Sequence, residues 1–369
     1  MMVCVSHDAG FYGAQLLLLH INQVLKTQLG FQVTTVLLGG GELRPQFEAV
    51  GEVVDFTDPP WRVAPPPEVL QARQREIRRL YQAGARQVIC NTSVSGQVVR
   101  LFREAGFRVL VLVHELPNLI RDFGLEGAVR EIGRWADCVV FPAEYVRDRF
   151  LPISGLEAGR AVIRPQGLYR PSPYRNRRAE ARSQLLAESG WPAVARIVVA
   201  AGQGDRRKGI DLFCQVAVRV LRERAETRFL WIGDDTTELA RDCKAWLESA
   251  GAAGRVRFTG VVQDPDRYLQ LLAGADLYPM SSREDPFPSV VLDALDAGLP
   301  VAGFAGAGGF GELLDAGAGI QVPFEDRAAM AAAVAGLLDE PDRAGAMGEV
   351  GQRLIASRFD FADYVHDLL

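Results

Sequence analysis

The chain has 369 residues, of which 48% are hydrophobic and 24% charged, and its formal net charge is −5. This composition is typical of a globular protein and excludes a disordered chain, a collagen-like repeat and a coiled coil. Chains longer than about 250–300 residues usually split into domains, so we expect two separate cores. The acidic balance argues against nucleic acid as a partner.

The five cysteines are odd in number, lie far apart and include no CxxC pair. This spacing argues against a disulfide framework and a structural zinc site, and it favours a reducing compartment. Strand-like residues begin at Val3 with no basic segment ahead of them, and the apolar stretch 16–19 is too short to span a bilayer. We therefore expect a cytoplasmic protein.

The first part of the chain alternates short apolar runs with segments of helical periodicity. A helix is predicted over 13–29, and Gly30 ends it. The glycines at 39–41 predict a turn. Strands are predicted at 3–5, 32–38, 88–91, 108–113 and 138–141. Continuous apolar strands separated by helices indicate parallel βαβ units.

This pattern stops at Pro165, where a segment rich in Pro, Arg and Tyr begins. We interpret 166–195 as a linker with a lead-in helix at 179–189. Further strands are predicted at 196–201, 228–232, 256–259, 275–278, 300–304 and 319–322. The predicted domains are therefore 1–165 and 196–355, followed by a terminal segment 356–369. Two doubly wound α/β domains place ligands beyond the carboxyl ends of their strands, so we expect the main site in a cleft between them.

The predicted helix at 68–82 concentrates positive charge in Arg73, Arg75, Arg78 and Arg79. Two interpretations stay open. The arginines form a solvated helix face, or they make peripheral contact with anionic lipid at the inner face of the membrane or with an anionic acceptor.

A second helix is predicted over 289–298, with Ser289 as its N-cap and Gly298 at its end. Asp285 lies before this helix, and Asp293 lies eight residues later, one turn inside it. A helix N-terminus has free N–H groups and a partial positive charge, which suit a phosphate. Both carboxylates are therefore candidates to face one ligand there.

These residues resemble a known family. The spacing Asp285-x7-Asp293 is similar to the E-x7-E signature of family 4-type retaining glycosyltransferases with the GT-B fold. Five further segments match in order: VSHDAGFYGAQLLLLHI (5–21), VHE (113–115), AGQGDRRKGIDLF (201–213), FTG (258–260) and GG-x-x-E (308–312). The chain departs from the pattern because Asp replaces both glutamates, Pro replaces the two glycines between them, and Glu284 competes with Asp285 for the first acidic role.

The resemblance implies two Rossmann-like domains facing a central cleft, with the acceptor in the first domain and a nucleotide-diphosphate sugar in the second. It implies a terminal segment that crosses back to the first domain. It also implies a catalytic Lys208 at the leaving diphosphate. The family usually has an arginine shortly before this lysine, which this chain lacks, and Arg207 is the candidate to replace it. Cations there stabilise the transition state because the diphosphate gains negative charge as the glycosidic bond breaks.

The remaining roles are also implied by the resemblance. Asp285 and His114 are the other catalytic candidates, and both contact the transferred sugar. Asp293 binds the ribose, and Gly260 lies by the base. Further donor-binding residues are Gly13, Glu284, Phe287 and Glu312. His7, which ends a strand beside Asp8, belongs to the acceptor side. We expect no metal and no resident cofactor, since side chains and a helix end supply the positive charge.

The sequence thus predicts a metal-independent retaining glycosyltransferase acting on a glycan or glycolipid hydroxyl by front-face substitution. Two alternatives stay open: a sugar-nucleotide epimerase of the same architecture, and a catalytically silent sugar-nucleotide-binding subunit. The dinucleotide fingerprint GxGxxG is absent around Gly10 and Gly13, which counts against a nicotinamide dehydrogenase.

Overall fold

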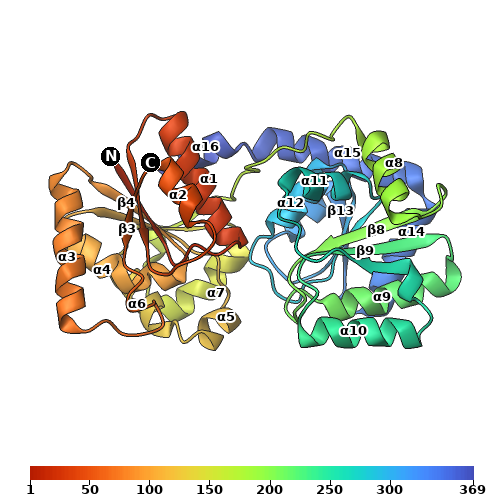
Figure 1. Cartoon of the computed structure of the whole chain (residues 1–369), viewed down its shortest axis with the longest axis horizontal. Helices are drawn as coiled ribbons and strands as arrows, with labels where there is room; N and C mark the ends of the chain where they lie inside the picture. Colours follow the sequence, from red (N-terminus) through yellow and green to blue (C-terminus); the bar gives the residue numbers. More distant parts are fainter. The chain divides into compact units, whose positions relative to one another are not determined.

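The computed structural model describes residues 1–369, which form two compact units (Figure 1). Unit 1 comprises Met1–Tyr169 and Phe361–Leu369, and unit 2 comprises Arg170–Asp360. The predicted first domain ended at 165, four residues before the observed boundary, and the chain returns to unit 1 at Phe361 rather than at 356.

Unit 1 is built on a parallel sheet of seven strands in the order β3-β2-β1-β4-β5-β6-β7. The strands are β1 (Met2–Ser6), β2 (Val33–Leu37), β3 (Glu52–Asp55), β4 (Gln87–Asn91), β5 (Arg108–Leu112), β6 (Cys138–Phe141) and β7 (Ala161–Ile163). The five predicted strands are confirmed. The sequence analysis missed β3 and β7 because these edge strands are short and only partly buried, so they lack a continuous apolar run.

Helices cover both faces of this sheet. They are α1 (Gly13–Thr27), α2 (Arg44–Val50), α3 (Pro67–Gln82), α4 (Gly96–Glu104), α5 (Pro117–Asp122), α6 (Glu126–Trp135), α7 (Glu144–Ser154) and α16 (Phe361–His366). Successive side chains of a strand point to opposite faces. Val3 and Val5 of β1 therefore join the core under α3, α4, α6 and α7, while Cys4 joins the core under α1, α2 and α16.

The terminal segment is part of unit 1. Four of its side chains are buried in the core that covers β1 and α1: Phe361, Tyr364, Val365 and Leu368. The side chains of Gln87 and Arg108 donate to the carbonyls of Leu368 and Leu369, at 3.1 and 3.0 Å. The last residues of the chain therefore close one face of the first sheet.

Unit 2 contains six parallel strands in two runs, β10-β9-β8 and β11-β12-β13. A single parallel bridge between Val198 and Leu277 joins the runs. The strands are β8 (Arg196–Ala201), β9 (Thr227–Ile232), β10 (Val256–Phe258), β11 (Tyr278–Met280), β12 (Val301–Phe304) and β13 (Gly319–Val322). The predicted limits of β11, 275–278, are wrong. Asp276 precedes the strand because its carboxylate accepts from Arg182 and from the backbone N–H of Ile197.

The helices of unit 2 are α8 (Arg178–Ser189), α9 (Ile210–Glu223), α10 (Glu238–Ser249), α11 (Pro265–Ala273), α12 (Ser289–Asp296), α13 (Gly311–Leu313), α14 (Arg327–Asp339) and α15 (Pro341–Arg358). The predicted N-cap of α12 is wrong. Pro288 holds the cap position in extended conformation, and Ser289 is the first helical residue, with no side-chain cap. Gly298 follows the helix at φ 75°, the left-handed conformation that glycine adopts most easily.

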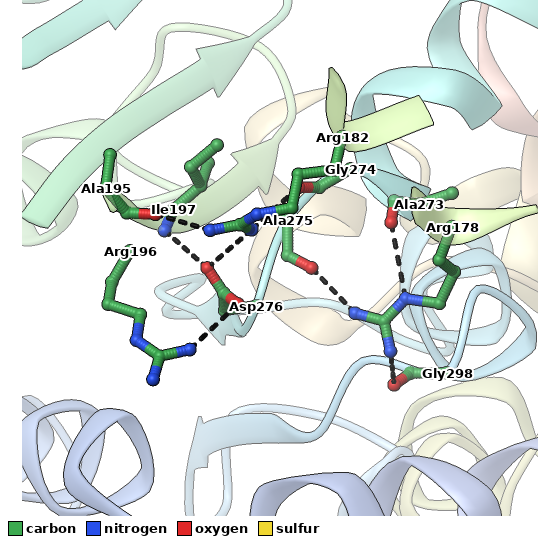
Figure 2. A network of polar contacts seen from close by, with 10 residues as sticks. All are labelled: Arg178, Arg182, Ala195, Arg196, Ile197, Ala273, Gly274, Ala275, Asp276 and Gly298. Atoms are coloured by element: carbon green, nitrogen blue, oxygen red, sulfur yellow. Dashed lines mark hydrogen bonds and ion pairs between the residues drawn. The ribbon is translucent and has the colours of Figure 1, made fainter. Parts of the chain in front are cut away.

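The segment predicted as a linker with a lead-in helix contains α8. Figure 2 shows the contacts that two of its arginines, Arg178 and Arg182, make with other parts of unit 2. Arg178 of α8 donates to the carbonyls of Ala273, Ala275 and Gly298, at 3.3, 2.7 and 3.1 Å. The terminal carbonyls of a helix lack partners within the helix. Ala273 is the last residue of α11, Ala275 lies two residues after α11, and Gly298 lies two residues after α12. These contacts attach α8 to unit 2.

Two of the four arginines singled out in α3 have structural roles. Arg73 is buried and donates to the carbonyl of Phe56 at 2.6 Å. Arg79 pairs with Glu52 and Glu76, each at 2.6 Å. Arg75 and Arg78 are exposed. None of the helices combines the length and the hydropathy needed to cross a bilayer.

We predict that Arg178→Met lowers the free energy of unfolding by about 3 kcal/mol, because it leaves three carbonyls without their donor. Arg177→Met is the matched control, since Arg177 is exposed and its guanidinium contacts Glu180 and the ring of Tyr174 rather than backbone carbonyls. Thermal melting of both variants tests this. Equal melting temperatures would show that α8 is held by apolar contacts instead.

Candidate functional site

In unit 2, the predicted leaving-group lysine contacts the predicted first acid. Lys208 lies on the loop between β8 and α9, and its Nζ forms an ion pair with Oδ2 of Asp285. Their side chains are 17% and 7% exposed. The backbone N–H of Lys208 also donates to Oδ1 of Asp205 at 2.6 Å. The pair thus joins two loops at the carboxyl ends of β8 and β11.

Glycine at 209 allows these loops to approach. Its φ is 72°, and a Cβ there would lie 2.0 Å from the carbonyl oxygen of Ser281. Any other residue would therefore push the Lys208 loop away from the Asp285 loop.

The Gly308-Gly309 pair of the predicted motif has a packing role. The backbone N–H of Asp285 donates to the carbonyl of Ala307 at 2.8 Å, and that of Gly309 donates to the carbonyl of Pro286 at 2.9 Å. A Cβ on Gly308 would lie 1.8 Å from the carbonyl oxygen of Asp285. These glycines hold the acidic loop in position. Glu312 lies on the short helix α13 and is exposed.

Arg207 and Glu284 stand beside the ion pair. Nη1 of Arg207 donates to the carbonyl oxygen of Glu284 at 3.2 Å. Arg283 joins the same two loops, since its Nη1 donates to the carbonyl of Arg206 at 2.7 Å. Its guanidinium also pairs with Asp211 of α9 at 2.7 Å and with Glu325 after β13. The sequence analysis missed this arginine, whose position next to the acidic loop was the only available signal.

Asp293 has different neighbours from Asp285. It is buried in α12, and the hydroxyl of Tyr268 donates to its Oδ2 at 3.1 Å. Burial raises the pKa of Asp293 to about 7, and the nearby Asp296 adds to this effect. Tyr268 is a further candidate residue that the sequence analysis did not identify.

Two other predicted donor residues lie on neighbouring loops of unit 2. Phe287 stacks on Phe359, with ring centroids 6.2 Å apart. Gly260 follows β10 at φ 70°, and its carbonyl accepts from the N–H of Gly233 at the end of β9. Their ligand-binding roles stay predictions.

In unit 1, a polar cluster lies where the order of the strands reverses. His7 follows β1 and Thr92 follows β4, the two strands that flank the reversal. Nδ1 of His7 lies 3.1 Å from Oγ1 of Thr92, and Nε2 lies 3.0 Å from Nε2 of Gln15 and 3.4 Å from Oδ2 of Asp8. Ligands of doubly wound sheets bind at such reversal points.

His114 follows β5 at the same edge of the sheet. Its Nε2 lies 3.1 Å from Oδ1 of Asn91, which requires the proton on Nε2 and leaves Nδ1 as an acceptor. Burial lowers the pKa of His114; Glu115 opposes this shift and His7 reinforces it. Glu115 is buried and accepts from Ser93 N–H and Oγ at 2.9 and 2.7 Å. His114 is therefore neutral at neutral pH.

Thr92 is strained. Its φ is 74°, a conformation that costs a β-branched residue about 1–3 kcal/mol and that often marks a functional site. Asn91 ends the predicted strand 88–91 and Thr92 follows it, so the strand-end rule that selected His7 and His114 could have identified them.

The glycines near α1 have different roles. Gly13 is the first residue of α1 and is exposed, and nothing lies within 4 Å of a Cβ built on it. The turn at 39–41 contacts the loop that carries His7. A Cβ on Gly41 would lie 2.2 Å from the carbonyl carbon of Ala9.

A cavity of about 610 Å³ lies elsewhere, between β3 and α3. Carboxylates dominate its lining: Glu52, Asp55, Asp58, Glu68 and Glu76. No residue of the two polar clusters lines it, so it is not the candidate site.

Residues 195–340 match the sequence model of the family described as Glycosyl transferases group 1. The D-inositol 3-phosphate glycosyltransferase of Nocardia farcinica is 29% identical over 354 residues, which cover 89% of this chain and 72% of that enzyme. The enzyme of the same name from Thermobispora bispora is 32% identical over 206 residues, 53% of this chain and 45% of that enzyme. The second alignment thus spans less than half of that relative's length.

Solved structures share the whole architecture. Anabaena HepE in complex with UDP superposes with a TM-score of 0.83 at 18% identity, covering 100% of this chain and 98% of that one. Sucrose-phosphate synthase from Thermosynechococcus elongatus superposes with a TM-score of 0.78 at 22% identity, covering 100% and 96%. At these identities the likeness shows the fold.

We predict that Asp293→Asn stabilises the protein more at pH 8 than at pH 5. The carboxyl has a pKa of about 7 when folded and about 3.9 when unfolded, so the folded state holds a proton that the unfolded state has lost. The wild type therefore loses stability as pH rises from about 4 to 7, and asparagine does not titrate. Melting temperatures of both proteins at the two pH values test this. A constant difference between them would contradict it.

Proposed function

Because the chain is a transferase of the GT-B fold with a group 1 glycosyltransferase domain at 195–340, we propose that it moves a sugar from a nucleotide-diphosphate donor to an acceptor hydroxyl. The proposed acceptor is a glycan or glycolipid, and the transfer keeps the anomeric configuration. The donor binds unit 2, and the acceptor binds unit 1.

The Lys208–Asp285 pair is the observation that supports this proposal most directly. Diphosphate oxygens gain negative charge as the bond to the anomeric carbon breaks. A preorganised ammonium group beside them stabilises that charge more in the transition state than in the ground state. Arg207 supplies a second cation on the same loop. The free N–H groups at the start of α12, after Pro288, favour a phosphate at the same place.

We propose that Asp285 contacts the transferred sugar. Its backbone is fixed by Ala307, and its carboxylate, beside Lys208, can accept hydrogen bonds from sugar hydroxyls. We propose Asp293 with Tyr268 for the ribose and Gly260 for the base. Gly13, Glu284, Phe287 and Glu312 complete the proposed donor set.

In unit 1, the neutral His114 offers Nδ1 as an acceptor for a hydroxyl of the transferred sugar, and His7 lies close to it on the acceptor side. In the proposed front-face reaction, the acceptor oxygen bonds to the anomeric carbon on the side that the diphosphate leaves. The acceptor proton passes to the departing phosphate oxygen. No covalent carboxylate intermediate is then needed, unlike in the retaining glycosidases. The positive charge comes from side chains, so we propose a reaction without metal.

Donor identity and reaction type are tested together. Ligands that bind only the folded state raise the melting temperature, so UDP-, GDP- and dTDP-sugars are screened by thermal shift. UDP-glucose is the first donor to try, because UDP is bound in the Anabaena HepE structure. Products are then analysed with and without acceptor. Conversion of the donor sugar without acceptor would identify an epimerase, and binding without any turnover would identify a silent subunit.

We predict that Lys208→Ala lowers turnover at least ~100-fold through loss of leaving-group stabilisation. Arg206→Ala is the matched control, since Arg206 is an exposed cation two positions away. Steady-state kinetics on folded protein of both variants test this. Near-normal transfer by Lys208→Ala would remove the leaving-group role.

We predict that Asp293→Ala weakens donor binding about 10–100-fold, the value of a hydrogen bond to a charged group. Calorimetric titration with the nucleoside diphosphate measures it. An unchanged affinity would reject the ribose assignment while leaving the role of Lys208 intact.

A further inference from the structure

An aromatic cluster lies beside His7 in unit 1, and the proposed function does not use it. The ring of Trp61 meets the His7 imidazole edge-on, with centroids 6.4 Å apart at 86°. It meets Phe123 in the same way, at 6.3 Å and 75°. The side chain of Gln97 donates to the carbonyl of Trp61 at 2.7 Å, which fixes the loop that carries this tryptophan. Phe123 nevertheless remains 43% exposed.

The fold explains why these rings meet. Trp61 lies on the loop after β3, His7 follows β1, and Phe123 follows α5, which comes after β5. All three strands are parallel members of one sheet, so their carboxyl ends share an edge. The cluster therefore extends the polar site of His7 and His114 along that edge.

Arg62 completes the cluster. Its Cζ lies 4.6 Å from the centroid of Trp61 and 5.2 Å from that of Phe123. It takes part in none of the ion pairs of the structure, whereas Arg44, Arg79 and Arg100 in the same unit all pair with carboxylates. Two aromatic rings thus hold an exposed guanidinium in position and leave its donors for a ligand.

We propose that Trp61, Arg62 and Phe123 form an acceptor subsite for an anionic group, a phosphate or a carboxylate, carried by the acceptor sugar or polyol. This inference rests on the proposed function and adds the chemical class of the acceptor. A planar guanidinium binds either group in bidentate fashion. The exposed ring of Phe123 offers an apolar face for a sugar ring, and His7 lies further along the edge for its hydroxyls.

The test uses the whole chain saturated with UDP and three probes that share one ring: glucose 6-phosphate, glucuronate and glucose. Isothermal titration gives their affinities. We expect both anions to bind at least about tenfold more tightly than glucose, the size of one charge-assisted hydrogen bond. In Arg62→Gln the anions should bind no better than glucose. Arg130→Gln, which removes an exposed arginine on α6, should keep the preference.

Equal affinities for the three probes, or no binding of either anion, would overturn the subsite. So would a preference that survives Arg62→Gln. In a second experiment, binding to anionic vesicles of phosphatidylglycerol is compared with binding to vesicles of phosphatidylcholine. If Arg62→Gln removed binding to anionic vesicles without changing the sugar affinities, the cluster would be a membrane contact instead. UDP binding is measured separately in each variant. Its absence in the wild type would count against the proposed function rather than against Arg62.

Discussion

The ion pair between Lys208 and Asp285 is the constraint on which the geometry of unit 2 depends. Burying two charges costs desolvation energy, which the pair offsets only when both partners are held in place. Here the positions are held by backbone contacts that tolerate nothing larger than glycine at 209 and 308. The result is a lysine whose position is defined at the edge of the sheet where we propose that the diphosphate binds.

The two units differ in the chemistry that they present. The edge of unit 2 carries cations and a helix N-terminus, which suit a diphosphate. The edge of unit 1 carries imidazoles, amides and hydroxyls, which suit the hydroxyl groups of sugars. The neutral state of His114 follows from burial, and a charged imidazole there could not accept a hydrogen bond at Nδ1. Arg62 adds an exposed cation to this edge.

One case of backbone strain and one of unfavourable burial lie at or beside residues with proposed roles. Thr92 adopts a positive φ beside His7, and Asp293 is a carboxyl in a buried helix that charges only near neutral pH. Both features cost stability, and neither is needed to complete a doubly wound sheet. Proteins commonly lose stability at the residues that bind or react, since the groups used there cannot also be optimal for packing.

The order of residues along the chain was enough to predict the parallel strands and the two-unit plan, and the resemblance of the motifs to a known family predicted the GT-B fold. Buried parallel strands can be recognised as continuous apolar runs. The spacing of residues within a motif can be read directly from the sequence, because it depends on local geometry. Edge strands β3 and β7 were not predicted, because partly buried strands lack a continuous apolar run. The contacts between distant segments could not be predicted. Lys208 meets Asp285 across 77 residues of chain, Tyr268 reaches Asp293, and Trp61 meets Phe123. Such pairs form because parallel strands bring their carboxyl ends to one edge. Which side chains then touch depends on loop conformation and packing, which the local pattern of residues does not encode.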